Sequence, residues 1–217
     1  MRAAAGAACL DGSLGRTALD GGGEAVAIDA DSIRMMRVRE GDVEAFHELF
    51  AKYHKPIFNY CFRVIGNRDR AEELTQDAFL QIYRARERYE PRARFVTYLF
   101  RVATNLCLNE KRHLSIREGT FSLDASRGGE YGDLPRELPD PRAESAETVV
   151  GRDEIALQVQ KTLAGLPGRQ SSALLLSRVN GMSYSEVSDT LGISVNAVKS
   201  LVFRATRVLR SELQLDG

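Results

Sequence analysis

The chain has 217 residues, of which 43% are hydrophobic and 28% charged, an ordinary balance for a globular protein. No apolar run approaches the ~20 residues that a transmembrane helix needs, so we expect no membrane insertion. The net charge is zero, but residues 31–113 and 151–217 are basic (+4 and +2), whereas residues 1–30 and 114–150 are acidic (−2 and −4). Two basic segments that flank an acidic one favour nucleic acid as a partner.

Signals for secretion, metal binding and catalysis are missing from the sequence. The Ala-rich stretch after Arg2 is interrupted by Asp11 and Gly12, which argues against a signal peptide and for a cytoplasmic location. The three cysteines are far apart, and we expect Cys61 and Cys107 to be small core residues rather than zinc ligands or disulfide partners. Without an HExxH, a P-loop or a nucleophile elbow, we predict no enzyme, no cofactor and no metal.

The N-terminal half of the chain is predicted to hold an extension and one helical domain. Residues 1–30 are rich in Ala, Gly and Asp and are expected to be disordered. The domain covers residues 31–113, and its first strong helix starts near Val43. Pro56 falls inside that helix and predicts a kink or a break. The apolar face of the helix consists of Phe46, Leu49, Phe50, Tyr53, Ile57, Tyr60, Cys61 and Val64.

Two more helices are predicted in this domain. Asp69 is expected to cap the first of them after a turn at residues 66–67. A basic loop, residues 86–94, then leads to a helix from about Phe95 to Arg112. The residues expected to be buried on these two helices are Ala71, Leu74, Ala78, Ile82, Phe95, Leu99, Val102 and Leu106.

A second stripe on the last of these helices, the polar stripe, combines an aromatic ring, amides and guanidinium groups. It consists of Tyr98, Arg101, Asn105, Asn109 and Arg112. Such a mixture suits stacking on unpaired bases and binding of their backbone. Positive charge is concentrated just upstream, near Tyr89, in Arg84, Arg86, Arg88, Arg92 and Arg94. The residues alone leave a second interpretation open, in which the stripe packs against another helix.

Residues 114–150 differ in composition from both flanking segments. They contain several glycines, prolines and acids and few large apolar residues, which is typical of a flexible acidic linker. Helical patterning resumes near Arg152, and Pro167 is expected to start a helix that ends at Gly181. No segment shows convincing strand alternation. The predicted fold is therefore all-α, with two small helical domains, the second over residues 151–217.

The most specific local pattern lies in this second domain. Ser183 and Glu186 match a capping box for a short helix over residues 184–191. Gly192 provides a tight turn, and Ser194 can cap a longer helix. A short helix, a glycine turn and a longer second helix are the parts of a helix-turn-helix.

The second helix of this motif presents a set of residues suited to duplex DNA. This recognition face consists of Asn196, Lys199, Ser200, Phe203, Arg204 and Arg207. Four basic residues and no acid occur from Lys199 to Arg210. Such side chains reach phosphates and guanine edges when the helix enters the major groove. The alternative is a solvated basic face on an ordinary helical bundle.

Two segments resemble the sigma factors of bacterial RNA polymerase. DRAEELTQDAFLQIYRARERYEPRARFVTYLFRVATNLCLNEKR, residues 69–112, is similar to their second domain. TLAGLPGRQSSALLLSRVNGMSYSEVSDTLGISVNAVKSLVFRATRVLRSEL, residues 162–213, is similar to their fourth. Nothing similar to the first or third domain lies between them, which resembles the extracytoplasmic-function subfamily. The resemblance covers residues 32–213 except the linker.

The resemblance implies roles for particular positions. Glu73, Gln76 and Asp77 match positions that face core RNA polymerase. The recognition face matches the part that reads the minus-35 element, and residues 89–112 match the part that melts and reads the minus-10 element. Within that part, the implied contacts are Tyr89, Arg92, Arg94 and the polar stripe. The resemblance also implies an anti-sigma partner, and it places the acidic linker, Asp124 to Glu147, in the RNA exit region as an electrostatic mimic of RNA.

Four positions depart from the family pattern. Tyr98 stands where tryptophan is usual, and Asn109 where aspartate is frequent. Ala197 and Leu201 replace a frequent threonine and a frequent arginine of the recognition helix. These changes leave the family resemblance intact and the promoter sequence undetermined.

An ordinary helix-turn-helix repressor or activator is the main rival hypothesis. It accounts for residues 183–207 but not for the helix from Asp69 or for the polar stripe. Co-purification with core polymerase distinguishes the two, because a sigma factor binds core polymerase and a repressor need not.

Overall fold

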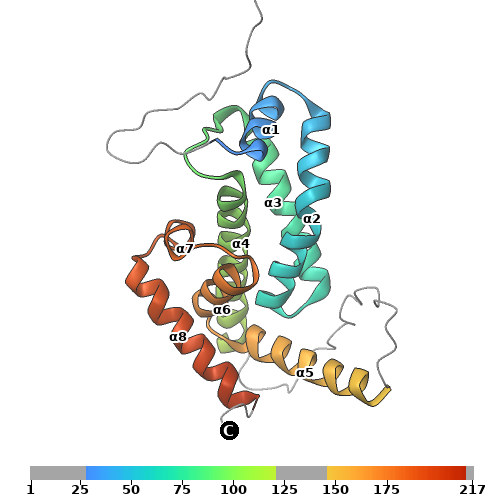
Figure 1. The fold of residues 1–217 in the computed structure, drawn as a ribbon, viewed down its shortest axis with the longest axis vertical. Coiled ribbons are helices and arrows are strands. Elements are labelled where there is room, and N and C mark those ends of the chain that lie inside the picture. Colours follow the sequence, from blue (N-terminus) through green and yellow to red (C-terminus); the bar gives the residue numbers. More distant parts are fainter. Residues whose placement is uncertain (1–27, 121–145, 214–217) are drawn as a thin grey trace, which may run out of the picture.

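The computed structural model describes residues 28–120 and 146–213, and these ranges contain helices and no strand (Figure 1). The predicted all-α fold is confirmed for this part of the chain. Residues 1–27 and 121–145, with most of the expected extension and linker, lie outside the described residues. The α-helices are α1 (Ala30–Arg39), α2 (Val43–Ile65), α3 (Arg68–Arg84), α4 (Phe95–Thr120), α5 (Ala146–Gly165), α6 (Gly168–Leu174), α7 (Tyr184–Leu191) and α8 (Val195–Glu212).

Helices α1 to α4 form the N-terminal unit, in which α2, α3 and α4 pack around one apolar core. Tyr60 lies in this core, where its hydroxyl is 2.8 Å from the Thr104 hydroxyl and its ring meets Phe100 edge-on. Cys61 and Cys107 are buried free thiols, as expected for small core residues. A short 3₁₀ turn, η1 (Arg86–Arg88), begins the basic loop between α3 and α4.

Of the kink or break that was predicted at Pro56, the break does not occur. The helix continues from Val43 to Ile65 with Pro56 inside it. Pro56 lies on the exposed face, where water can bind the carbonyl that loses its amide partner. Its neighbours Tyr53 and Ile57 are buried and hold both halves of the helix on the core.

Three helix ends differ from the sequence-based expectation. The cap of α3 is Asn67 rather than Asp69, and its side chain accepts a hydrogen bond of 2.8 Å from the Arg70 amide. Asp69 lies in the first turn, where its charge favours the helix N-terminus. Helix α4 continues to Thr120, and α5 begins at Ala146, so both ends of the predicted linker are helical.

Helix α1 was not predicted, because its pattern is short and mostly polar. Asp29 caps it through the Ser32 amide, at 2.9 Å. Asp31 is almost fully buried, and the Tyr53 hydroxyl and the Lys52 ammonium each donate to it at 2.5 Å. Burial opposes the ionised form of Asp31, but these two hydrogen bonds outweigh it and lower the pKa of the carboxyl. The aspartate therefore fastens α1 to α2.

Helices α5 to α8 form the C-terminal unit. Helix α6 ends in a wider π-type turn over Leu175–Val179, and Gly181 follows with a left-handed φ of 66°. The apolar core of the C-terminal unit is continuous with that of the N-terminal unit. Helices α6 and α7 pack on α4, and α5 packs on the end of α2. Figure 1 shows α8 on the outer edge of this assembly. None of the helices in residues 28–120 and 146–213 is long and apolar enough to cross a membrane.

Candidate nucleic-acid and protein interfaces

The helix-turn-helix is built as the sequence predicts. The Ser183 side chain accepts from the Glu186 amide at 3.2 Å, and the Glu186 carboxylate accepts from the Ser183 amide at 2.9 Å, which completes the capping box of α7. Gly192 ends α7 with a left-handed φ of 62°, a conformation that is cheap for glycine. Ser194 then caps α8 through the Ala197 amide. These local signals fix the angle at which α8 leaves the turn.

Every residue of the recognition face is exposed on α8, whereas Val198, Val202 and Ala205 on the opposite face are buried. Phe203 is the extreme case, with 69% of the residue accessible to solvent. The Ser200 hydroxyl donates to the Asn196 carbonyl at 3.1 Å. The face thus combines cations, an amide and an aromatic ring on a rigid helix, which suits contacts to phosphates and base edges.

The polar stripe follows the outer side of α4. Arg101, Asn105, Asn109 and Arg112 are exposed, and the Arg112 guanidinium donates to the Asn109 amide oxygen at 3.3 Å. Tyr98 is half-buried, and burial raises the pKa of its hydroxyl, so the ring stays neutral. The stripe is therefore a surface rather than a helix-packing face in this arrangement.

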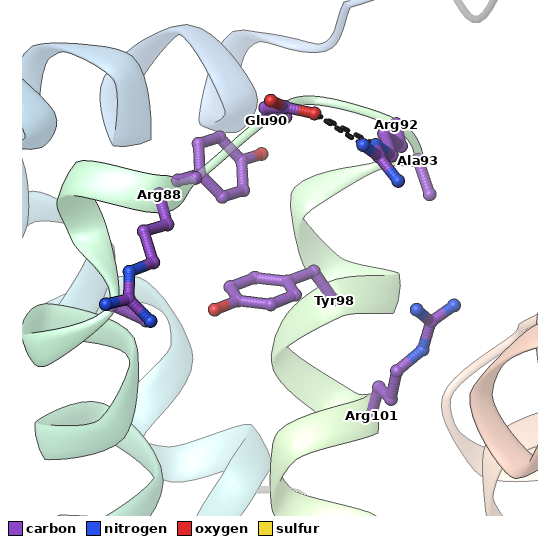
Figure 2. A pocket seen from close by; sticks show the side chains of 8 residues that line it. Arg88, Glu90, Arg92, Ala93, Tyr98 and Arg101 are labelled. Atoms are coloured by element: carbon purple, nitrogen blue, oxygen red, sulfur yellow. Dashed lines mark hydrogen bonds and ion pairs between the residues drawn. The ribbon is translucent and has the colours of Figure 1, made fainter. Parts of the chain in front are cut away.

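A hollow of about 430 Å³ lies between the upper end of the polar stripe and the basic loop. Figure 2 shows the Tyr98 ring reaching from α4 towards Arg88, with Arg101 on its other side and Arg92 paired with Glu90 above. The rest of the lining consists of Ala85, Tyr89 and Ala93. An aromatic ring flanked by cations is a surface on which an unstacked base can lie.

The three predicted contacts in the loop are placed differently from one another. Arg92 is exposed beside the hollow, while Tyr89 is only 4% exposed, and its hydroxyl donates to the Ser32 hydroxyl at 3.2 Å. The Tyr89 ring packs on Tyr98 with ring centroids 5.5 Å apart, so it forms part of the wall of the hollow. Arg94 instead points to the C-terminal unit, where its guanidinium is 3.5 Å from the Glu186 carboxylate.

Sequence reasoning missed Arg88 and Glu90 as lining residues of the hollow. Arg88 appeared only as one of several arginines that concentrate charge. Its place beside Tyr98 results from the η1 turn, and such a turn has no strong sequence signal.

A second hollow, the apolar groove, lies between α2 and α3 and measures about 460 Å³. Its lining consists of Val43, Phe46, His47, Phe50, Gln76, Phe79, Leu80 and Tyr83. Phe46 and Phe50 were expected in the buried face of α2, but Phe50 is 37% exposed, and Leu80 opposite is 48% exposed. Open apolar surface of this kind is typical of sites that bind proteins or other ligands. The apolar residues of the groove have the same helical spacing as a buried core face, so the sequence could not distinguish the groove from the core.

Of the three polar residues predicted to face the polymerase, one lines this groove and two lie elsewhere on α3. Gln76 lines it, and Glu73 and Asp77 are exposed on the same helix. Glu73 is held by Arg70, whose guanidinium also binds Glu110 of α4 at 2.8 Å. These ion pairs raise the pKa of Arg70 further, so the cation is fixed between the two helices. The groove itself combines an apolar lining with the polar side chains of Gln76 and His47, a composition that is usual in protein interfaces.

No group of three or more potential metal ligands occurs among the residues that the structure describes. The fold defines a helical DNA-binding protein with a helix-turn-helix, which also exposes the polar stripe on α4 and an apolar groove between α2 and α3. Two family matches make this specific: sigma-70 region 2 over residues 49–115 and sigma-70 region 4 over residues 156–209.

Curated relatives are similar to this chain over nearly their whole length. RNA polymerase sigma-H factor of Pseudomonas aeruginosa is 31% identical over 86% of this chain and 95% of its own. ECF RNA polymerase sigma factor SigW of Bacillus subtilis is 28% identical over 83% and 95%. The chain therefore belongs to the sigma-70 family, in its extracytoplasmic-function (ECF) subfamily. It is a transcription initiation factor for promoter-specific transcription by RNA polymerase.

Solved structures have the same fold. CnrH in complex with the cytosolic domain of CnrY superposes with a TM-score of 0.61 at 22% identity, over 87% of this chain and 100% of that chain. The sigma factor RpoE from Bartonella quintana, in complex with the anti-sigma factor NepR, gives a TM-score of 0.58 at 19% identity, over 79% and 98%.

Proposed function

We propose that this sigma factor divides promoter recognition and polymerase binding among three surfaces. The recognition face on α8 reads the minus-35 element, the polar stripe and its hollow read the minus-10 element, and the apolar groove docks on core polymerase. The observation that carries the proposal is the separation of two nucleic-acid faces, one on each unit, in a chain that matches regions 2 and 4.

At the minus-35 element, α8 enters the major groove with its N-terminal half first. Lys199 and Arg204 supply contacts to phosphates or guanine, and Asn196 contacts bases or backbone near the start of the helix. Phe203 offers its ring to an apolar feature of the groove. A good bidentate base contact contributes about 1–3 kcal/mol of discrimination.

At the minus-10 element, the chain holds a base that has left the stack. Unstacking costs a few kcal/mol, and stacking on Tyr98 with hydrogen bonds from the hollow offsets that cost. The amide of Asn105 and the guanidinium groups of Arg101 and Arg112 then follow the single strand along α4. Their order on one straight helix supports a continuous path of several nucleotides.

Core polymerase docks on the apolar groove and its rim. Phe50 and Leu80 provide the apolar contacts, and Glu73, Gln76 and Asp77 provide the polar ones. Because the groove is on α2 and α3, it leaves the polar stripe of α4 available to DNA.

We further propose that an anti-sigma protein controls this chain, as the NepR complex of the structural relative suggests. Action on RNA polymerase places the protein in the cytoplasm, and it works by binding, with no reaction of its own. The acidic segment proposed to mimic RNA lies almost wholly outside the described residues.

Run-off transcription tests the proposal. Purified chain, core polymerase and promoter candidates from the protein's own genome should give transcripts that start at defined positions only when the chain is present. Absence of any chain-dependent transcript, together with no binding to core polymerase, would instead favour an ordinary helix-turn-helix repressor.

A further inference from the structure

Arg70 links the helix that carries the polymerase-facing residues to the helix that carries the polar stripe. From the first turn of α3 its guanidinium reaches Glu110 of α4, where two of its nitrogens donate to the two carboxylate oxygens at 2.8 Å each. The third nitrogen donates to Glu73, which lies on α3 itself. One cation is therefore shared by two carboxylates that lie on different helices.

The contact between Arg70 and Glu110 is a built ion pair rather than a chance surface contact. Two parallel N–H···O bonds form a planar fork, which binds a carboxylate strongly and fixes its orientation. The two residues are 40 positions apart in the chain, and the Glu110 side chain is only 14% exposed. A partly buried ion pair is screened less by water and salt than an exposed one.

Glu110 lies where a carboxylate conflicts with the proposed binding of DNA. It is the only acid in the sequence between Phe95 and Arg112, and it directly follows Asn109 of the polar stripe. In the same helical turn, the Arg112 guanidinium donates to the Asn109 amide oxygen at 3.3 Å. A negative charge therefore lies beside two residues that are proposed to contact the single strand.

The distances involved are short enough for this charge to act on DNA. Adjacent Cα atoms are about 3.8 Å apart, so a phosphate bound at Asn109 would lie on the order of 10 Å from the Glu110 carboxylate. The Debye length is about 10 Å at 0.1 M salt and about 30 Å at 0.01 M. Repulsion between the two anions is consequently appreciable at low salt unless a cation balances the carboxylate.

We propose that Arg70 is a positioning residue for the reading of the minus-10 strand, because it neutralises Glu110 and so keeps the C-terminal half of the polar stripe open to a phosphate backbone. The inference rests on the proposed function, in which the single strand follows α4 past Asn105 and Arg112. Arg70 need not touch DNA in this role, since it acts through the carboxylate that it binds.

A purely structural role for Arg70 is the alternative. The same fork fastens α3 to α4, and its loss would loosen the N-terminal unit whatever the charge at position 110. The two roles differ in one respect: removal of the acid can compensate for a lost neutralising charge, but it cannot restore a lost fastening. Glu73, the other carboxylate bound by Arg70, offers a matched comparison, because it lies on α3 and its side chain is 60% exposed.

Binding of single-stranded DNA by the free, full-length chain tests the inference. The probe is a short fluorescein-labelled DNA of random sequence, and fluorescence anisotropy at about 0.02 M salt measures its Kd. Arg70→Met should weaken binding about fivefold, because the charge of Glu110 is no longer balanced by the guanidinium. At about 0.2 M salt the difference from the native chain should shrink to about twofold, since the Debye length is then shorter.

Two double variants distinguish neutralisation from fastening. Arg70→Met combined with Glu110→Gln should restore the native Kd to within about twofold, although the fork is still missing. Arg70→Met combined with Glu73→Gln removes the same amount of negative charge and should bind as weakly as Arg70→Met alone. Equal recovery in both would show that only net charge matters, and recovery in neither would assign Arg70 to structure. Either result would overturn the inference.

Single variants keep the test valid if Arg70→Met is unstable. Glu110→Gln leaves α3 unaltered and should raise the affinity for the probe about threefold. Arg68→Met is the control, because its guanidinium lies over the Phe58 ring, 5.6 Å from the centroid, and it should leave the Kd unchanged. Circular dichroism verifies the helix content of each variant. An unchanged affinity in Glu110→Gln would show that this carboxylate does not oppose DNA.

Arg112→Ala separates the inference from the proposed function. It removes a cation of the polar stripe itself and should weaken binding of the probe. Unchanged binding would contradict the use of the polar stripe for DNA, and the inference with it. Weaker binding in Arg112→Ala together with native binding in Arg70→Met would contradict the role of Arg70 alone.

Discussion

Arg204 extends from the recognition face into solvent and forms no ion pair in the structure's described part. Arg204→Ala should lower affinity for a minus-35 duplex by about 1–3 kcal/mol, or from about fivefold to about 150-fold, because a contact to guanine or phosphate is lost. Fluorescence anisotropy of the holoenzyme on labelled duplex measures this effect. Binding to core polymerase should be unchanged, and Arg210→Ala, on the same helix outside the recognition face, is the control. Equal loss of both activities would contradict the assigned role.

Asn105 lies in the middle of the polar stripe, where its amide faces solvent. Asn105→Ala should slow formation of the open complex about tenfold while closed-complex binding changes little, because the amide meets DNA only after bases leave the stack. Stopped-flow fluorescence of a base analogue at the minus-10 element follows the melting step. Ser115→Ala, also exposed on α4, provides the comparison. An unchanged melting rate would remove Asn105 from the site.

Phe203 is the most exposed large apolar residue on α8. The thymine methyl group is the apolar feature that the major groove offers to such a ring. Replacing the thymines of the minus-35 duplex by uracil removes only that methyl, and it should weaken binding by roughly 1 kcal/mol, or about fivefold. Phe203→Ala should abolish the difference between the two duplexes. Equal affinity of the native chain for both duplexes would show that the ring does not read thymine.

At the scale of elements, α1 depends on one ionised carboxyl. The pKa of Asp31 is below its ordinary value of 3.8, so its contribution to stability is present above that pH and lost as the pH falls through the lowered value. In urea unfolding between pH 3 and pH 6, the free energy of unfolding should decrease as the pH drops below about 4. The decrease should be less steep in Asp31→Asn. If the free energy of unfolding of the variant depends on pH as steeply as that of the native chain, other carboxyls cause the acid sensitivity.

Elements with strong local signals could be predicted almost to the residue. The capping box at Ser183, the glycine turn at Gly192 and the cap at Ser194 correctly predicted both ends of α7 and the start of α8, because all three act within four residues. The start of α3 was misplaced because both Asn67 and Asp69 are good caps, and only tertiary packing chooses between them. Helix α1 was missed because an aspartate in the sequence suggests a surface position, whereas Asp31 is buried.

At the scale of the whole molecule, the groove should control polymerase binding independently of DNA. Leu80 is 48% exposed in the groove, whereas Gln81 is exposed outside it. Leu80→Asp should reduce affinity for core polymerase at least tenfold, since a charge would be buried without a partner in the complex. Gln81→Asp adds the same charge and should have little effect. Surface plasmon resonance on immobilised core polymerase compares them, and similar affinities would place docking elsewhere.

The association of the two units could not be read from the sequence. Hydrophobic periodicity reveals that a helix has a buried face but not which helix covers it. The interface uses Gly168 and Gln160, which are small or polar and give no apolar signal. The polar stripe, in contrast, was recognisable because aromatic, amide and guanidinium groups at helical spacing are a poor match to an ordinary solvated face.

The outward position of the recognition face has a practical consequence. None of its six side chains takes part in the hydrogen bonds and ion pairs that join α5, α6 and α7 to the N-terminal unit. Under the proposed function, promoter preference and the packing of the two units are thus encoded by separate residues. We expect that grafting another factor's six residues onto α8 gives a synthetic regulator with a new target sequence, without redesign of how the two units pack.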